Sequence, residues 1–271
     1  MLPISTCGEL DADSTPFYRE VLEALDAAGV PFLVGGAFAL TCYTRVERQT
    51  KDLDLFIRRA DYGRTAAALQ AAGHEALLVH PHWLAKVHGG EFFVDLIFGS
   101  GNGLCEVDDE WFRHAADARL LGLAVKIMPL EESIWSKAFI MERERYDGAD
   151  IAHLLQAGAG RIDWMRLLQR FGPHWRVLLS HLLLFGFVYP AERAQVPGWV
   201  LQRLLDRLRD EQAATPPPER ICQGTLLSRE QYLVDVELQG WRDARIAPFG
   251  PMTAQDVACW TEAIPGRQPL P

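Results

Sequence analysis

The sequence predicts an α+β protein in which a small mixed sheet with flanking helices precedes a mostly helical domain. Two observations lead to this prediction. Up to residue 128, short segments of alternating polar and apolar residues lie between segments with helical periodicity. Beyond Pro129, helical patterns follow one another and are separated by glycine and proline. We therefore expect an α/β domain over 1–128, a helical domain over 129–213, and a proline-rich linker with a C-terminal tail packing on the body over 214–271.

The elements follow from their periodicities, since helices repeat apolar residues on one face and strands alternate with period two. Helices are expected at 16–29, 37–43 and 61–73, and Asp61 is the expected N-cap of the third. Strands are expected at 31–36, 51–58, 74–80, 83–89 and 91–99, the last two joined by a hairpin at Gly89-Gly90. The helical domain shows patterns at 129–158, 162–172, 173–190 and 197–212.

The composition argues against several classes of protein. The 271 residues carry a formal net charge of −9, which disfavours a surface built for broad phosphate-backbone binding. The five cysteines are scattered and never spaced as CxxC, so neither a disulfide framework nor a zinc site is expected. The first residues lack the pattern of a signal peptide, and the apolar run at 177–189 is too short to span a bilayer. We therefore expect a cytoplasmic protein with no membrane partner.

Two aspartates one residue apart, Asp52 and Asp54, lie in a segment that otherwise favours burial. On a strand their side chains project to the same side, whereas Leu53 and Leu55 project to the other. Two adjacent carboxylates repel and raise each other's pKa, so they need either a cation or water. An edge strand with one solvated face is the alternative to a cation site.

A third carboxylate, Asp95, lies between Val94 and Leu96 in an even more apolar strand. A lone buried aspartate would cost several kcal/mol unless it is paired or ligated. If this strand neighbours the strand of Asp52 and Asp54, three carboxylates converge. Such oxygen-only ligation suits Mg²⁺ or Mn²⁺.

A glycine pair, Gly35-Gly36, ends the first strand and precedes a helix. Free backbone N–H groups and the helix dipole favour an anion there, and glycine lets a phosphate approach the backbone closely. Taken alone, the pair is equally typical of a tight turn. Together with the three aspartates it describes a triphosphate-binding element facing a metal site.

At this point the sequence resembles a family. The stretches "VGGAFAL", "RQTKDLDLFI" and "VDLIF" are similar to the motifs of the nucleotidyltransferase superfamily that contains DNA polymerase β. The fifteen residues between Gly36 and Asp52 make a longer spacer than the common one, closer to antibiotic nucleotidyltransferases and the abortive-infection toxin branch. Arg48, Thr50 and the two aspartates also fit those branches. The resemblance covers roughly residues 30 to 100.

The resemblance implies a function for each of these residues. Asp52 and Asp54 are expected to hold one metal ion on the triphosphate of an NTP, and Asp95 to share a second ion and act as general base. Gly35 and Gly36 are expected to bind phosphate through their amides. Basic and polar residues before the second strand are expected to contact phosphate or the acceptor, with a solvated loop as the alternative: Arg45, Arg48, Thr50 and Lys51.

A second stretch, "SKAFIMERERYDGADIAHLL", is similar to the helix that follows the catalytic core in the toxin-like branch. There the resemblance implies that Lys137 contacts the nucleotide phosphates and that Asp147 and Asp150 pack on or polarise the site. A solvated amphipathic helix with ion pairs four residues apart is the alternative.

These expectations describe an enzyme that transfers NMP from an NTP to a hydroxyl of an unidentified acceptor, with release of pyrophosphate. The acceptor classes left open are a small molecule, an RNA end and a protein. A toxin-like enzyme would arrest growth when expressed, and an antibiotic-modifying enzyme would confer resistance. The alternatives to an enzyme are a nucleotide-binding module without turnover and a protein whose helical domain binds a cognate partner.

Overall fold

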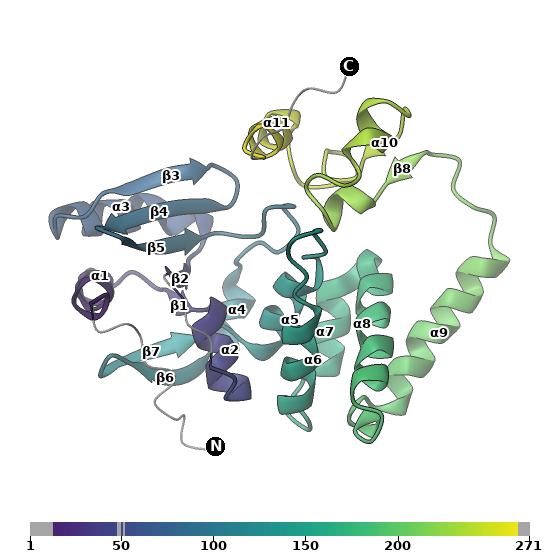
Figure 1. Ribbon diagram of the computed structural model, residues 1–271, viewed down its shortest axis with the longest axis horizontal. Coiled ribbons are helices and arrows are strands. Elements are labelled where there is room, and N and C mark those ends of the chain that lie inside the picture. Colours follow the sequence, from purple (N-terminus) through teal and green to yellow (C-terminus); the bar gives the residue numbers. More distant parts are fainter. Residues whose placement is uncertain (1–12, 48–49, 51, 265–271) are drawn as a thin grey trace. The chain divides into compact units, whose positions relative to one another are not determined.

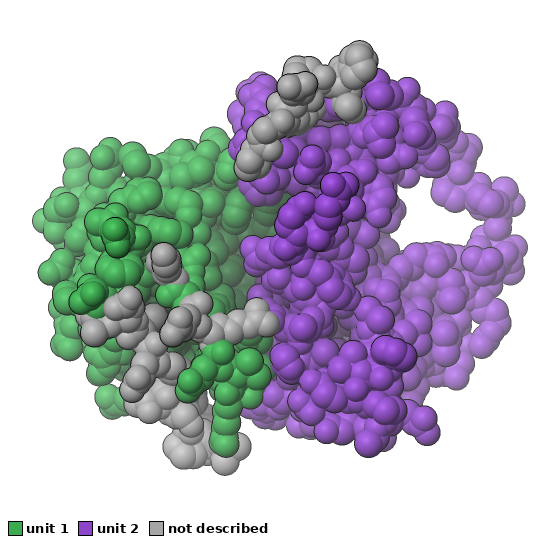
Figure 2. Space-filling view, in the orientation of Figure 1, with its two compact units in different colours: residues 1–129 green, residues 130–271 purple. Residues whose placement is uncertain are grey.

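The structure is a computed structural model that describes residues 13–47, 50 and 52–264. The chain divides into two compact units, residues 1–129 and 130–271 (Figure 2). The first unit contains a mixed seven-stranded sheet with helices, and the second is mostly helical (Figure 1). The predicted fold class is therefore confirmed. The assignment of separate functional domains stays a prediction.

The sheet of the first unit has the strand order β3-β4-β5-β2-β1-β7-β6. β2 runs parallel to β5, β1 runs parallel to β7, and the other neighbouring strands are antiparallel. The strands are β1 (Leu33–Val34), β2 (Asp52–Phe56), β3 (Ala76–His80), β4 (Leu84–Gly89), β5 (Phe92–Ile97), β6 (Ala116–Leu120) and β7 (Leu123–Ile127). β2 and β5 therefore lie side by side near the middle of the sheet.

One apolar core holds this unit together. Leu53 and Leu55 of β2 are buried and join a single cluster with Val94 of β5 and with the inner face of the first helix, including Leu22 and Leu25. Burying such side chains stabilises the fold by about 1.5–3 kcal/mol each. The helices of the unit are α1 (Thr15–Ala27), α2 (Gly36–Thr44), α3 (Tyr62–Ala71) and α4 (Asp109–Arg113). The expected helices at 16–29, 37–43 and 61–73 thus correspond to α1, α2 and α3.

Two details of the first unit differ from the expectation. The β6–β7 hairpin was not predicted, and its turn contains the non-glycine residue Leu121 with a φ of 52° followed by Gly122. Asp61 does occupy the N-cap position of α3 but makes no side-chain cap hydrogen bond. Its carboxylate instead accepts a hydrogen bond from Arg58 at 3.1 Å, because the preceding turn brings that guanidinium within reach.

The second unit begins with four helices that pack around buried aliphatic and aromatic side chains, among them Ile134, Leu154 and Leu178. Its helices are α5 (Leu130–Ala138), α6 (Gly148–Ala157), α7 (Trp164–Phe171), α8 (Trp175–Val188), α9 (Gly198–Ala213), α10 (Leu233–Glu237) and α11 (Ala254–Glu262). The single helical pattern expected over 129–158 is wrong in one respect, because it is split into α5 and α6 by an irregular segment.

A buried ionic network links α5 to α7. Glu132 is completely buried and contacts Arg166 at 2.6 Å and Arg170 at 2.8 Å. Glu131, one residue earlier, also pairs with Arg166 and accepts a hydrogen bond from the backbone N–H of Asp163 at 2.6 Å. Burial raises the pKa of Glu131 above its usual range, which the neighbouring Arg166 opposes. Each carboxylate in this network is thus directed at a guanidinium group.

The stretch 214–271 contains short elements and its own buried ion pair. The strands β8 (Ile221–Cys222) and β9 (Arg242–Asp243) pair in parallel. Arg245 is completely buried and donates to the Asp243 carboxylate, to Oδ2 at 2.6 Å. The backbone N–H of Arg229 donates to Glu142 at 2.7 Å, which joins this stretch to the segment between α5 and α6.

Cys105, Cys222 and Cys259 are free thiols, whereas Cys42 is disulfide-bonded. Among the residues that the structure describes, none of the helices combines the length and the apolar character needed to cross a bilayer.

Candidate functional site

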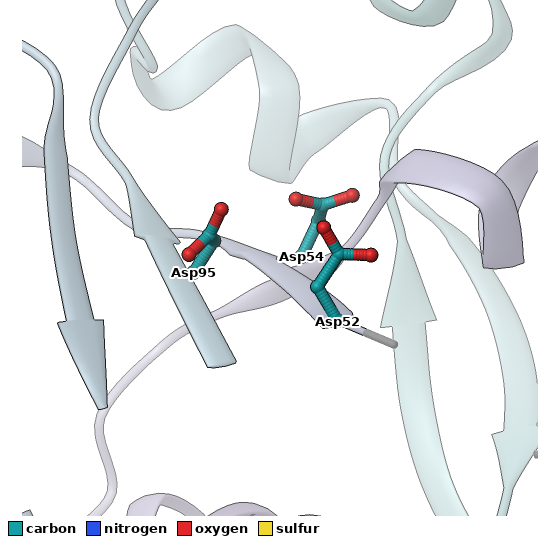
Figure 3. Close-up of side chains that lie close together, drawn as sticks. All are labelled: Asp52, Asp54 and Asp95. Atoms are coloured by element: carbon teal, nitrogen blue, oxygen red, sulfur yellow. The ribbon is translucent and has the colours of Figure 1, made fainter. Parts of the chain in front are cut away.

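Three carboxylates converge on one face of the sheet in the first unit (Figure 3). The parallel register of β2 and β5 places Asp54 directly opposite Asp95, and Asp52 lies two residues earlier on the same face of β2. Each of the three side chains offers an oxygen, and these oxygens lie within 4.8 Å of one another. All three residues are partly exposed, in contrast to the buried Leu53 between Asp52 and Asp54. The expectation that the two strands are neighbours is confirmed.

The start of α2 lies directly against this cluster. Gly36 has a φ of 55°, and a Cβ atom added there would fall 1.6 Å from Oδ2 of Asp54. The backbone N–H of Gly35, the N-cap residue, donates to the carbonyl oxygen of Asp54 at 2.9 Å. No acidic residue occupies the first turn of α2. The glycine pair therefore brings an acid-free helix N-terminus into van der Waals contact with one of the carboxylates.

Residues just before β2 were also expected in the site. The hydroxyl of Thr50 donates to Oδ1 of Asp52, so this side chain holds one of the three carboxylates. Arg45 ends α2 in the left-handed conformation, with a φ of 61°. Arg48 and Lys51 lie outside the described residues, and their expected contacts stay predictions.

A lysine that we did not predict contacts the third carboxylate. Lys86 lies opposite Asp95 in the antiparallel β4–β5 pair, and its Nζ donates to Oδ1 of Asp95 at 2.7 Å. The ammonium group also lies over the ring of Phe93, 3.9 Å from its centroid. Burial raises the pKa of Asp95 above its usual range, and Asp52 adds to this effect, whereas Lys86 opposes it.

The sequence does contain a signal for Lys86. The Gly89-Gly90 hairpin expected between these strands, closed by a two-residue turn at residues 90 and 91, sets the register that places Lys86 opposite Asp95. Lys86 also breaks the apolar pattern of its strand, since Ala85 and Val87 on either side are buried. A polar face on β4 next to a carboxylate on β5 was therefore predictable.

Lys137 lies in the second unit and is held by two carboxylates. Its Nζ contacts Oδ2 of Asp147 at 3.0 Å and Oδ2 of Asp150 at 2.8 Å. Asp147 also accepts hydrogen bonds from Arg145 at 3.1 Å. Burial alone would raise the pKa of Asp147, but Arg145 and Lys137 together hold it below its usual range. The expected contact between Lys137 and a nucleotide stays a prediction.

The comparison of sequences identifies the family of this chain. Residues 17–184 match the family described as uncharacterised nucleotidyltransferases, which is more than half of the chain. The chain belongs to this family and is therefore an enzyme of the nucleotidyltransferase class. A comparison with curated proteins gives no match.

Several solved structures are similar to the chain at low identity. The antibiotic-resistance factor ANT(2")-Ia in complex with adenylyl-2"-tobramycin is 16% identical, with a TM-score of 0.39 over 73% of this chain and 99% of that one. The lincosamide antibiotic adenylyltransferase LnuA, bound to lincomycin, is 12% identical, with a TM-score of 0.37 over 54% and 98% of the two chains. A putative nucleotidyltransferase from Thermotoga maritima is 10% identical, with a TM-score of 0.37 over 46% and 83%.

Proposed function

We propose that this enzyme transfers NMP from an NTP to a hydroxyl group of an acceptor, with release of pyrophosphate, and that it needs a divalent cation. The observation that carries the proposal is the convergence of three carboxylates next to the glycine-rich start of α2. Three carboxylates gathered from two strands repel one another, which makes it costly to keep all of them ionised. A cation between them removes that cost, and the adjacent helix N-terminus favours an anionic ligand.

The donor set fits Mg²⁺ or Mn²⁺. All three ligating groups are carboxylates on rigid neighbouring strands, and such hard cations prefer oxygen ligands. Asp52 and Asp54 would hold an ion that also contacts the triphosphate, and Asp95 would share a second ion with them. Ions bound in this way supply charge neutralisation for the phosphates and lower the pKa of an acceptor hydroxyl.

The protein groups have separate tasks in the proposed reaction. The amide of Gly36 donates to a phosphate oxygen, since glycine allows close approach at the start of α2, whereas the expected role of the Gly35 amide is wrong because it already donates to the carbonyl oxygen of Asp54. Thr50 orients the carboxylate of Asp52. Asp95 accepts the proton of the acceptor hydroxyl as a bond forms between that oxygen and the α-phosphorus. The bond from the α-phosphorus to the bridging oxygen breaks, and pyrophosphate leaves.

Lys137 is proposed to contact the nucleotide phosphates, as the resemblance implies. Its two carboxylate partners restrict the ammonium group to a narrow range of positions, which lowers the entropy lost when a ligand binds. Lys137→Met should then weaken NTP binding more than Lys126→Met, because Lys126 is an exposed lysine that pairs only with Asp117 among the contacts described.

Calorimetry of each NTP with Mg²⁺ tests the proposal, on the native protein and on Asp54→Ala. The matched control is Asp117→Ala, an exposed strand carboxylate of the same unit. We expect Mg²⁺-dependent binding that is lost in Asp54→Ala and retained in Asp117→Ala. Absence of binding for every NTP, or equal binding by Asp54→Ala, would contradict the proposal. The NTP that binds is the donor. Transfer of a label from the α-phosphate of this NTP then identifies a small-molecule, RNA or protein acceptor.

A further inference from the structure

Lys86 forms an ion pair with the third carboxylate of the cluster, Asp95. Its Nζ lies 2.7 Å from Oδ1 of Asp95, a distance typical of a strong charge-assisted hydrogen bond. Both side chains are shielded, with 25% and 13% of their surfaces exposed. The ring of Phe93 beneath the ammonium group adds a cation–π contact and limits its movement. Lys86 is therefore held next to Asp95 by several contacts.

A second lysine in the same sheet shows what an ordinary pair of this kind looks like. Lys126 and Asp117 are also directly opposite each other on antiparallel strands, with an N–O distance of 2.8 Å. Their side chains are 52% and 77% exposed, and Asp117 is not part of the carboxylate cluster. The two pairs share their residue types and strand geometry, and they differ in burial and in what surrounds the carboxylate.

From this difference we infer that Lys86 is a positioning residue that acts as the resident counter-cation of Asp95 and competes with a divalent ion for that carboxylate. The inference rests on the proposed function, since it concerns the same cluster. Without nucleotide, the ammonium group holds Asp95 in place and repels a second positive charge. A divalent ion therefore binds Asp95 well only together with the anionic triphosphate, whose charge offsets this repulsion.

Competition and a purely structural role predict different changes in metal affinity. Loss of a competing lysine strengthens metal binding, whereas loss of a purely structural one does not. Replacing Lys86 by methionine keeps the length of the side chain and its contact with Phe93 but removes the charge. A unit charge within a few ångströms of a divalent ion costs more than a factor of ten in affinity even when partly screened by solvent. Lys86→Met should therefore bind Mn²⁺ alone about tenfold more tightly than the native protein. Lys86→Arg should restore the native affinity, because it restores the charge.

The test is a titration of the full-length protein with Mn²⁺ alone at pH 8, with free Mn²⁺ measured by electron paramagnetic resonance. Native protein, Lys86→Met, Lys86→Arg and the matched control Lys126→Met are compared after thermal unfolding confirms that each is folded. The inference is supported if Lys86→Met, and none of the other three proteins, binds Mn²⁺ more tightly. The gain should be smaller in an Asp95→Asn background, because the lysine then has no carboxylate to compete for and only its charge repulsion is left to relieve.

Unchanged or weaker Mn²⁺ binding by Lys86→Met overturns the inference. If the native protein still binds Mg²⁺ with an NTP in that case, the proposed function stands without it. If no variant binds Mn²⁺ and no NTP binds with Mg²⁺, both fail together.

Discussion

Two acidic clusters of this protein use the same chemical group in different ways. In the second unit, Glu132 is completely buried and its carboxylate pairs with two guanidinium groups. In the first unit, Asp52, Asp54 and Asp95 stay partly exposed and direct their oxygens at one another. The first arrangement joins two helices, and the second gathers ligands around a common point. Burial and the direction of the oxygens, more than the number of carboxylates, separate a structural cluster from a binding site.

The largest expected effect on stability comes from breaking the closed cluster. Glu132→Ala removes the buried carboxylate that pairs with both Arg166 and Arg170 and leaves Arg166 with Glu131, so the free energy of unfolding should fall by about 3–5 kcal/mol. Chemical denaturation measures this change. Glu23→Ala is the control, because Glu23 pairs with Arg19 on the surface, where such pairs contribute about 0–1 kcal/mol. Equal losses in the two variants would show that the buried pairs of Glu132 stabilise the protein no more than an exposed pair does.

A substitution next to the open cluster should affect ligand binding more than stability. Gly36→Ala places a methyl group on Oδ2 of Asp54 and strains the backbone, so NTP affinity measured with Mg²⁺ should fall by about 10- to 100-fold. Gly90→Ala is the matched control, because Gly90 has a φ of 70° but open space around it. Both variants should lose about 1–2 kcal/mol of stability through backbone strain. Normal NTP binding by Gly36→Ala would show that the contact with Asp54 is not needed.

A smaller, pH-dependent effect on the free energy of unfolding is expected for Asp147, which lies between Lys137 and Arg145. The pKa of its carboxyl is lower in the folded protein than its ordinary value, so ionised Asp147 contributes stability above that ordinary value, near pH 4. This contribution should be lost as the pH falls through the lower folded-state pKa. Unfolding free energies of the native protein and Asp147→Asn should therefore differ at pH 7 and converge towards pH 3. A difference that does not depend on pH would contradict this account.

The site was easier to predict than parts of the fold. Alternation along 51–58 and 91–99 placed the three aspartates on strands, and their convergence then required only that the two strands be neighbours. The break between α5 and α6 has no such local signal, because the segment from Phe139 to Tyr146 contains good helix formers. The backbone of this segment forms a hydrogen bond to a distant part of the chain, because the N–H of Met141 donates to the carbonyl oxygen of Leu227 at 3.0 Å. Contacts between residues distant in the sequence override the local propensity there.

The β6–β7 hairpin was missed for a local reason. Its inward-facing residues include the small Ala118, which gives a weak apolar alternation, and its turn starts at Leu121 instead of one of the usual turn residues. The charges of Asp117 and Arg119 on the exposed face are its clearest strand signal. The roles of Arg48 and Lys51 remain predictions, since both lie outside the described residues.

The central claim is that the open cluster exists to bind a divalent ion, and unfolding of Asp52→Asn with and without Mn²⁺ tests it most directly. Asp52 repels Asp95, and asparagine can keep the hydrogen bond from Thr50. Without the metal ion, the variant should be at least as stable as the native protein. With Mn²⁺ in large excess over its dissociation constant, the native protein should gain about 2–3 kcal/mol, and the variant should gain almost nothing. A variant that is less stable without Mn²⁺ and equally stabilised by it would show that the cluster is structural.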